Sequence, residues 1–140
     1  MTEPPLILVH TVRVPLPWDV LPLSQNQRLH WRKRNDITQD TIEEAGEAIA
    51  AAGIPHVAGC EVVLHHWPAT RHRKDADNMA PTLKACIDAL VAQGVITDDS
   101  WIEVPFSGQH IHTPTKTPPD GVRFVLEVRP CAGDAVVTDG

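Results

Sequence analysis

Hydrophobic and β-branched residues occur along the chain in segments whose spacing predicts alternating strands and helices. The first segment, Leu6 to Val14, is an apolar, β-branched run that several prolines bring to an end. A short apolar run bounded by turn residues is typical of a buried strand. Glu61 to Trp67 has the β-branched and aromatic content of a second strand, which Pro68 ends.

Apolar spacing of the helical kind begins after the first strand. Four apolar residues recur at intervals of three or four residues, which is about one helical turn: Ile42, Ala45, Ile49 and Ala52. Gly53 and Pro55 end this helix. Two starts are compatible with the pattern, because Thr41-Ile-Glu-Glu44 matches a capping box, whereas a start nearer Trp31 would place Arg32, Lys33 and Arg34 on the first turns.

A second helix is predicted after Pro81. Leu83, Ile87, Leu90 and Val91 fall on one apolar stripe, and Gly94 is typical of a helix end. Lys84 and Asp88, four residues apart on the flank of this stripe, could pair with each other or reach a functional site.

Two further strands are predicted, Trp101 to His112 and Val122 to Arg129, joined as a hairpin by the turn residues of Pro118-Pro-Asp-Gly121. The element order predicts an α/β (α+β) fold with one domain over residues 1–130, in which a mixed sheet of about four strands packs against two main helices. Residues 131–140 lack periodicity and are predicted to form a disordered tail.

Composition restricts the class of protein. A chain of 140 residues is large enough for one core. No apolar run approaches the roughly 18 residues that span a bilayer, and the first residues lack the features of a signal peptide, so we expect a cytoplasmic protein with no membrane contact. Cys60, Cys86 and Cys131 are odd in number and form no C-x-x-C pair, which argues against a disulfide framework and a cysteine zinc site.

Basic residues are clustered although the formal net charge is -6. Seven of the 12 lie in two short segments, namely Arg28, Arg32, Lys33 and Arg34, and then Arg71, Arg73 and Lys74. Phosphate backbones are bound largely by such residues, so a local nucleic-acid footprint is compatible with an acidic chain.

Carboxylates stand directly beside the second basic cluster. Asp75 and Asp77 follow it, and Asp98-Asp99 comes about twenty residues later. Mg²⁺ takes carboxylate oxygens together with water and substrate phosphate, and basic neighbours would hold the polyanion. This combination indicates a metal-dependent phosphodiester nuclease, although D-x-D by itself is also common in polar surface turns. Met79 and Ala80 at the next ligand and glycine positions exclude an EF-hand.

The same residues carry a resemblance to a known family. Its motif comprises Arg71-His-Arg-Lys-Asp75-Ala-Asp77-Asn78, Lys84, Ile87-Asp88-Ala-Leu90, Gly94-Val-Ile96 and Asp98-Asp99-Ser100, preceded by Leu23-Ser-Gln-Asn26-Gln-Arg28. This pattern resembles RusA-type Holliday junction resolvases. The resemblance is strongest over the central thirty residues and does not extend beyond Arg129.

The resemblance implies a homodimeric endodeoxyribonuclease of the kind that phages and prophages encode, dependent on Mg²⁺ with Mn²⁺ as a substitute. It would resolve four-way DNA junctions by paired symmetric nicks in recombination and repair. Asp75, Asp77 and Asp99 would be catalytic and bind the metal, and Lys84 would stabilise negative charge. Asp98 competes with Asp99, because adjacent residues point in different directions. The DNA contacts would be Arg71, Arg73, Lys74, Asn78, Arg28, Arg32, Lys33 and Arg34.

Other hypotheses remain open. The chain could bind branched DNA without cutting it, or could be a D-x-D transferase, although no glycine-rich phosphate loop supports the latter. His110 and His112 share a strand face and could bind a metal, but with no third ligand nearby in the sequence they are more typical of polar strand residues. His65 and His66 should face opposite sides of their strand. Trp31 and Trp67 could stack on unpaired bases or belong to the core.

Overall fold

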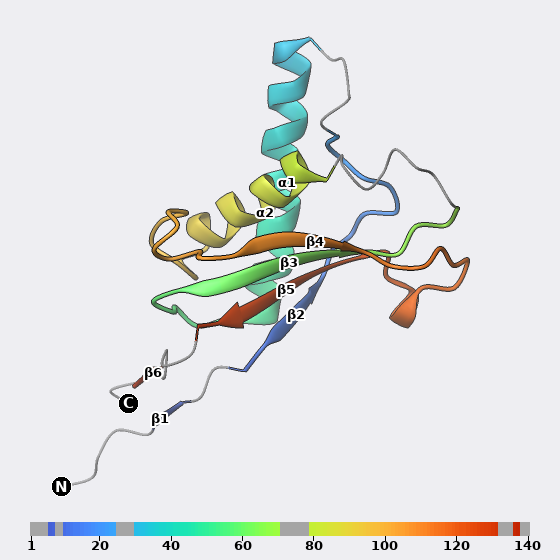
Figure 1. Cartoon of the computed structure of the whole chain (residues 1–140). Coiled ribbons are helices and arrows are strands. Elements are labelled where there is room, and N and C mark those ends of the chain that lie inside the picture. Colours follow the sequence, from blue (N-terminus) through green and yellow to red (C-terminus); the bar gives the residue numbers. More distant parts are fainter. Residues whose placement is uncertain (1–5, 8–9, 25–29, 71–78, 132–135, 138–140) are drawn as a thin grey trace, which may run out of the picture.

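The computed structural model describes residues 6–7, 10–24, 30–70, 79–131 and 136–137. Their elements, in chain order, are β1 (Leu6–Ile7), β2 (Val12–Pro15), α1 (Trp31–Ala52), β3 (Cys60–His66), α2 (Ala80–Ala92), β4 (Ser107–Ile111), the 3-10 helix η1 (Pro119–Gly121), β5 (Phe124–Pro130) and β6 (Val136–Val137). Figure 1 shows α1 and α2 beside the sheet, with the amino-terminal end of α1 rising away from it.

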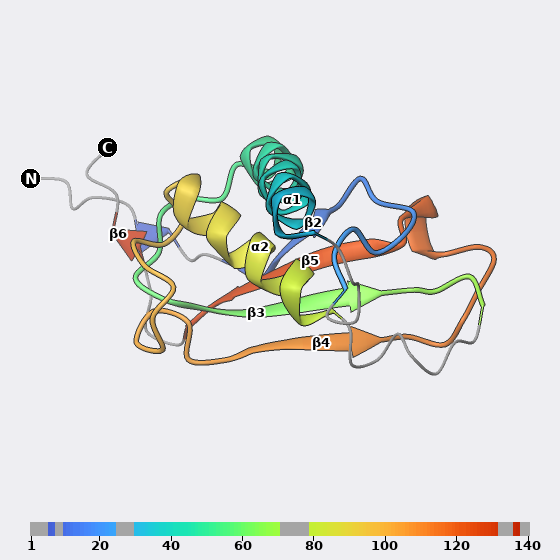
Figure 2. The same ribbon diagram turned by 90° about the horizontal axis from the view of Figure 1, so that it is seen from above.

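The main sheet has four strands in the order β2-β5-β3-β4. β3 and β4 are parallel, with α2 as the connection between them, and the other neighbours are antiparallel. Both helices cover the same face of the sheet (Figure 2). The predicted single α+β domain, with a mixed four-stranded sheet and two helices, is therefore confirmed.

The hydrophobic core lies between that face and the helices. Alternate residues of β3 and β5 point into it, and the register places Leu64 opposite Leu126 and His66 opposite Phe124. Ile49 of α1 and Leu90 of α2 close the core from the other side. The intervening residues of the two strands, among them His65 and Glu127, therefore face the opposite side of the sheet.

The predicted hairpin is wrong, because β3 lies between β4 and β5. β5 is largely buried and takes a central position, whereas β4 is mostly exposed and forms an edge. Strand β4 also begins later than expected, at Ser107. The preceding segment is a turn, in which the amides of Glu103 and Val104 donate to the carbonyl of Ser100. Sequence pattern identifies strands but not their partners, which accounts for the error.

The first strand is shorter than predicted. β2 begins only at Val12, and Leu6–Ile7 pairs separately with Val136–Val137. This second pair includes part of the predicted disordered tail. Residues 132–135 and 138–140 lie outside the described residues, so disorder there stays a prediction.

The structure selects the earlier start of the first helix. The His30 ring caps it by accepting from the amide of Arg32 at 3.3 Å. Thr41 is buried inside the helix, and its hydroxyl donates to the carbonyl of Ile37 at 2.6 Å, so the capping-box pattern is coincidental. Gly53, with φ 66°, ends the helix as expected.

The second helix agrees with its prediction. Pro81 lies in its first turn, where no amide donor is needed, and Gly94, with φ 76°, follows its end. Within the described residues, neither helix is both long and apolar enough to cross a bilayer.

Candidate functional site

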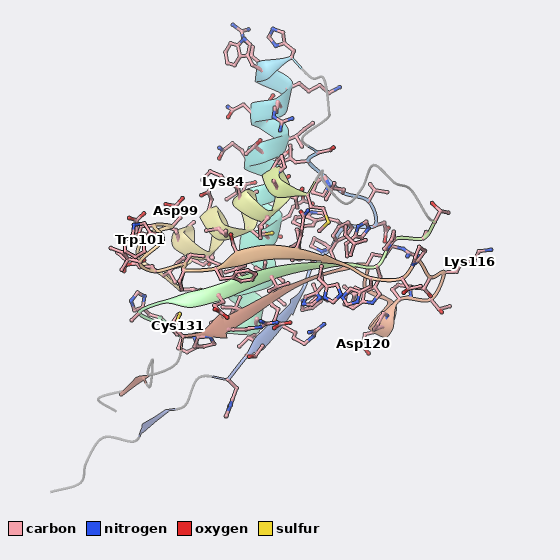
Figure 3. All side chains as sticks on the ribbon, in the orientation of Figure 1. Lys84, Asp99, Trp101, Lys116, Asp120 and Cys131 are labelled. Atoms are coloured by element: carbon pink, nitrogen blue, oxygen red, sulfur yellow. The ribbon has the colours of Figure 1, made fainter. Side chains whose placement is uncertain are left out.

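Lys84 and Asp99 meet on the surface beside α2. Lys84 and Asp99 lie close together (Figure 3). Lys84 Nζ lies 3.3 Å from Asp99 Oδ2 and 3.4 Å from Asp88 Oδ1, so the ammonium bridges two carboxylates. The sequence left open whether Lys84 pairs with Asp88 or reaches the predicted site, and the structure shows a contact with Asp88 and another with Asp99, one of the predicted site residues.

A tight turn after α2 brings Asp99 into position. The amide of Val95 donates to the carbonyl of Leu90, which folds the chain back beside the helix. Asp98 is engaged within its own turn: its Oδ1 accepts from the Asp99 amide at 2.8 Å, and its own amide donates to the Glu103 carboxylate. Consequently it is Asp99, not Asp98, that faces Lys84.

Electrostatics keep this pair charged. The Lys84 ammonium, followed by the hydrogen bond with Asp98, lowers the pKa of Asp99. In return, the hydrogen bond to Asp99 and the charge of Asp88 raise the pKa of Lys84. Near neutral pH the site therefore presents one fixed cation and a carboxylate that can accept a metal ion or a hydrogen bond.

The pair lies at a surface hollow of about 290 Å³. Its lining consists of Ala80, Leu83, Lys84, Ile87, Asp99 and Ser107. Ala80 is the first residue of α2, so the hollow extends to the amino-terminal end of the helix, where free amides and the helix dipole favour anions.

Several predicted site residues cannot be placed against this hollow. Asp75, Asp77 and Asn78, together with Arg71, Arg73, Lys74 and Arg28, lie outside the described residues. Their part in the site stays a prediction.

The other predicted DNA contacts occupy the first turn of α1. Arg32 and Lys33 are exposed, whereas Arg34 is partly buried and donates to the carbonyl of Ser24 at 3.3 Å. Trp31 is 67% exposed, with the Arg32 guanidinium 5.2 Å from its ring centre. None of these residues lines the hollow at Lys84, so the structure presents the described basic residues as a separate surface.

A second cluster, which the sequence analysis missed, occupies the sheet face opposite the helices. His65 of β3 is in register with His110 of β4, and His112 follows on the same side. One ring nitrogen from each of the three histidines lies within 4.8 Å of the other two. The expectation that His110 and His112 lack a third ligand is therefore wrong. The signal was present as three histidines at strand spacing, but only the parallel pairing of β3 with β4 brings them together.

A buried carboxylate anchors this histidine cluster. Glu127 Oε1 lies 2.7 Å from His65 Nε2 and 3.2 Å from the Arg13 guanidinium, and Arg129 pairs with its other oxygen. Burial alone would raise the pKa of Glu127, but the Arg129 guanidinium and the His65 ring lower it by more. Trp67 stacks on His112 with ring centres 4.1 Å apart, which gives Trp67 a local packing role.

The histidine cluster predicts a loss of stability in acid, measured in the presence of a chelator. Burial lowers the pKa of His65 and of His112 in the folded protein, so the folded state binds fewer protons than the unfolded chain. The free energy of unfolding should fall as the pH drops below the ordinary histidine pKa of about 6.5. Glu127, whose pKa is also lowered, should add a further loss at more acidic pH. Urea unfolding between neutral and acidic pH measures both steps.

The test variant for this pH dependence is His112→Gln, which should reduce the first step. The control is His10→Gln, at an exposed position outside the cluster, which should leave that step unchanged. Identical pH dependence in the two variants would contradict the assignment.

Comparison of the sequence with protein-family models and with curated proteins finds no match.

Proposed function

We propose that the chain is a Mg²⁺-dependent, structure-specific endodeoxyribonuclease of the RusA type that resolves four-way DNA junctions. The observation that carries the proposal is the meeting of Lys84 and Asp99, 15 residues apart in the sequence, at an open hollow. Both are residues that the motif assigns to catalysis. Their meeting supports the motif, because a fortuitous sequence pattern would not require these two side chains to face each other.

Chain connectivity limits how far Asp77 can lie from the hollow. Asp77 precedes Ala80 by three residues, so the backbone keeps the two Cα atoms within about 11 Å. Ala80 lines the hollow that holds Asp99. Asp75, Asp77 and Asp99 would then supply an all-oxygen donor set, which fits Mg²⁺ and also Mn²⁺.

The chemistry follows from this donor set. When bound, the metal would supply Lewis-acid activation of the scissile phosphate and of the attacking water. Asp99 would help to hold the metal in place of its ion pair with Lys84. The Lys84 ammonium would then stabilise the negative charge that develops on the phosphate. Asp88, 3.4 Å from Lys84 Nζ, would keep the ammonium in position.

The basic surface at the start of α1 supports DNA binding. Arg32, Lys33 and Arg34 occupy the first turn, which contains no acidic residue. Cations at this end oppose the helix dipole, at a cost of about 0.3–1 kcal/mol each when exposed. A bound phosphate backbone would offset this cost. In the proposal Arg28, Arg71, Arg73, Lys74 and Asn78 add further phosphate contacts, and the exposed Trp31 could stack on an unpaired base.

Dimerisation is part of the proposal, because two symmetric nicks require two equivalent sites. Trp101, which lies close to Asp99 (Figure 3), is 79% exposed, and its neighbour Ile102 is 70% exposed. In the proposal, these two side chains contribute to the contact between the subunits. The proposed setting is the cytoplasm of a prokaryotic cell, where a phage- or prophage-encoded enzyme would meet recombining DNA.

The test compares wild type with Asp77→Asn on a labelled synthetic four-way junction and on linear duplex, with Mg²⁺ or with chelator. We expect paired symmetric nicks in the junction only, dependent on Mg²⁺. Losing a metal ligand should remove several kcal/mol of transition-state stabilisation, so Asp77→Asn should be slower by at least about 100-fold.

The matched control is Asp120→Asn, an identical replacement in the turn before β5, away from Asp99 (Figure 3). Its φ of 55° is one that asparagine tolerates, so cleavage should be unchanged. Junction binding without cleavage under Mg²⁺ or Mn²⁺ would instead identify a non-cleaving branched-DNA-binding protein. A lack of preference for junctions over duplex would contradict the resolvase proposal.

A further inference from the structure

We propose that His65, His110 and His112 form a binding site for a divalent transition metal of the Zn²⁺ type. This site is separate from the carboxylate site proposed for Mg²⁺. It lies on the sheet face opposite the helices, at the ends of the parallel strands β3 and β4.

Strand geometry assembles the three ligands. Parallel pairing puts His65 directly beside His110, and alternation along the strand direction returns His112 to the same face. His65 Nδ1 lies 2.8 Å from His112 Nε2. One ring nitrogen from each of the three histidines lies within 4.8 Å of the other two. Tetrahedral zinc with Zn–N bonds of about 2.0–2.1 Å separates its nitrogens by about 3.3 Å. Small ring rotations would therefore admit the ion.

Glu127 supplies the outer support that such sites need. A metal-bound histidine usually donates its other ring N–H to a carboxylate, which fixes the tautomer and the ring orientation. His65 Nε2 lies 2.7 Å from Glu127 Oε1, so the N–H at Nε2 leaves Nδ1 as the lone-pair nitrogen facing the cluster. Glu127 is itself 6% exposed and held by Arg13 and Arg129, so it is a fixed acceptor.

The state of the ligands also suits a metal. The neutral imidazole is the form that binds a metal, and the contact between His65 Nδ1 and His112 Nε2 already directs a ring nitrogen of each toward the other. The metal would replace the hydrogen bond between these two rings, and His112 would carry its proton on Nδ1. Imidazole nitrogens favour Zn²⁺ and its transition-metal neighbours over Mg²⁺.

The site would keep one coordination position open. His110 is exposed, and the surface beside the cluster contains a hollow of about 480 Å³ lined in part by Trp67, whose ring stacks on His112. Three histidines and one open position accessible to solvent are the arrangement of reactive rather than purely structural zinc sites.

The test measures Zn²⁺ binding directly, by competition with a chromophoric chelator, on the full chain without an affinity tag. All variants carry Asp77→Asn, which weakens metal binding at the proposed nuclease site, and Cys131→Ser, which removes the partly exposed thiol. We expect saturable binding at the histidine site and a Co²⁺ absorption spectrum of nitrogen and oxygen ligands. Mg²⁺ should not compete.

Three variants make the test specific. His110→Ala and His112→Ala should weaken Zn²⁺ binding by more than the 10- to 100-fold typical of losing an outer partner, and Glu127→Gln should weaken it by about 10- to 100-fold. The control His10→Ala, at an exposed position outside the cluster, should bind as the parent does. Urea unfolding in chelator checks that each variant is folded.

Absence of saturable binding would overturn the proposal and leave the cluster as a hydrogen-bonded stack. Equal binding by His110→Ala and His10→Ala would also overturn it, because the metal would then lie elsewhere. The readout is metal binding in a background with the nuclease site impaired, so either proposal can fail without the other.

Discussion

Asp99→Asn is expected to lower Mg²⁺-dependent cleavage of a four-way junction by at least about 100-fold, because it converts a charged metal ligand into a neutral amide. The side chain keeps its size. Lys84 retains Asp88 as a partner at 3.4 Å, so the surface ion pairs rearrange rather than disappear. Exposed pairs of this kind contribute little to stability, because water and salt screen them. The loss should therefore appear in the cleavage rate of a fully folded protein, measured in single-turnover assays.

The neighbouring residue provides the matched control. Asp98 Oδ1 accepts from the Asp99 amide within the turn and does not face Lys84. Asp98→Asn keeps an oxygen that can accept the same hydrogen bond, so its cleavage rate should stay within a few-fold of wild type. The opposite result, with Asp98→Asn inactive and Asp99→Asn active, would reverse the assignment that the geometry supports.

Phe124→Ala is expected to cause the largest loss of stability, about 3–5 kcal/mol. Phe124 is fully buried in β5, between β2 and β3. Its ring stacks on His66 at 4.2 Å and meets the edge of Trp18 at 6.1 Å. Truncation would leave a cavity among residues from three segments of the chain. Domains of this size have a free energy of unfolding of about 5–15 kcal/mol, so much of the total would be lost.

The other phenylalanine makes a direct comparison possible. Phe106 precedes β4 and is 49% exposed, so Phe106→Ala removes the same atoms at a site already open to water. It should cost much less, on the order of 1 kcal/mol. Urea unfolding of both variants measures the difference. Equal losses would contradict the expectation that Phe124 is buried in the core and Phe106 is not.

Local features of the fold could be predicted from sequence where one physical signal dominates. The apolar stripe and the flanking Pro81 and Gly94 located α2 to within a few residues. The β-branched run ending at Trp67 located β3. The start of α1 could not be decided, because the polar residues between Trp31 and Thr41 carry no strong apolar pattern, and the His30 cap resembles no common capping signal.

Long-range relations could not be predicted in the same way. The expected β4–β5 hairpin assumed that strands adjacent in sequence pair with each other, but burial of both faces of β5 favours a central position beside β3. The meeting of Asp99 with Lys84 and the exclusion of Asp98 depend on a turn whose hydrogen bonds are not visible in the sequence. The histidine cluster depends on the strand pairing, which is why His65 was not recognised as the third member.

The sequence by itself determined the fold class and the identity of the candidate carboxylates and basic residues, because periodicity, charge and turn chemistry are local properties of the chain. Tertiary structure decided which of these residues meet. The reason is that strand order and register follow from burying apolar faces across the whole domain. Through that register alone, three histidines that are scattered along the chain become neighbours around one possible metal position.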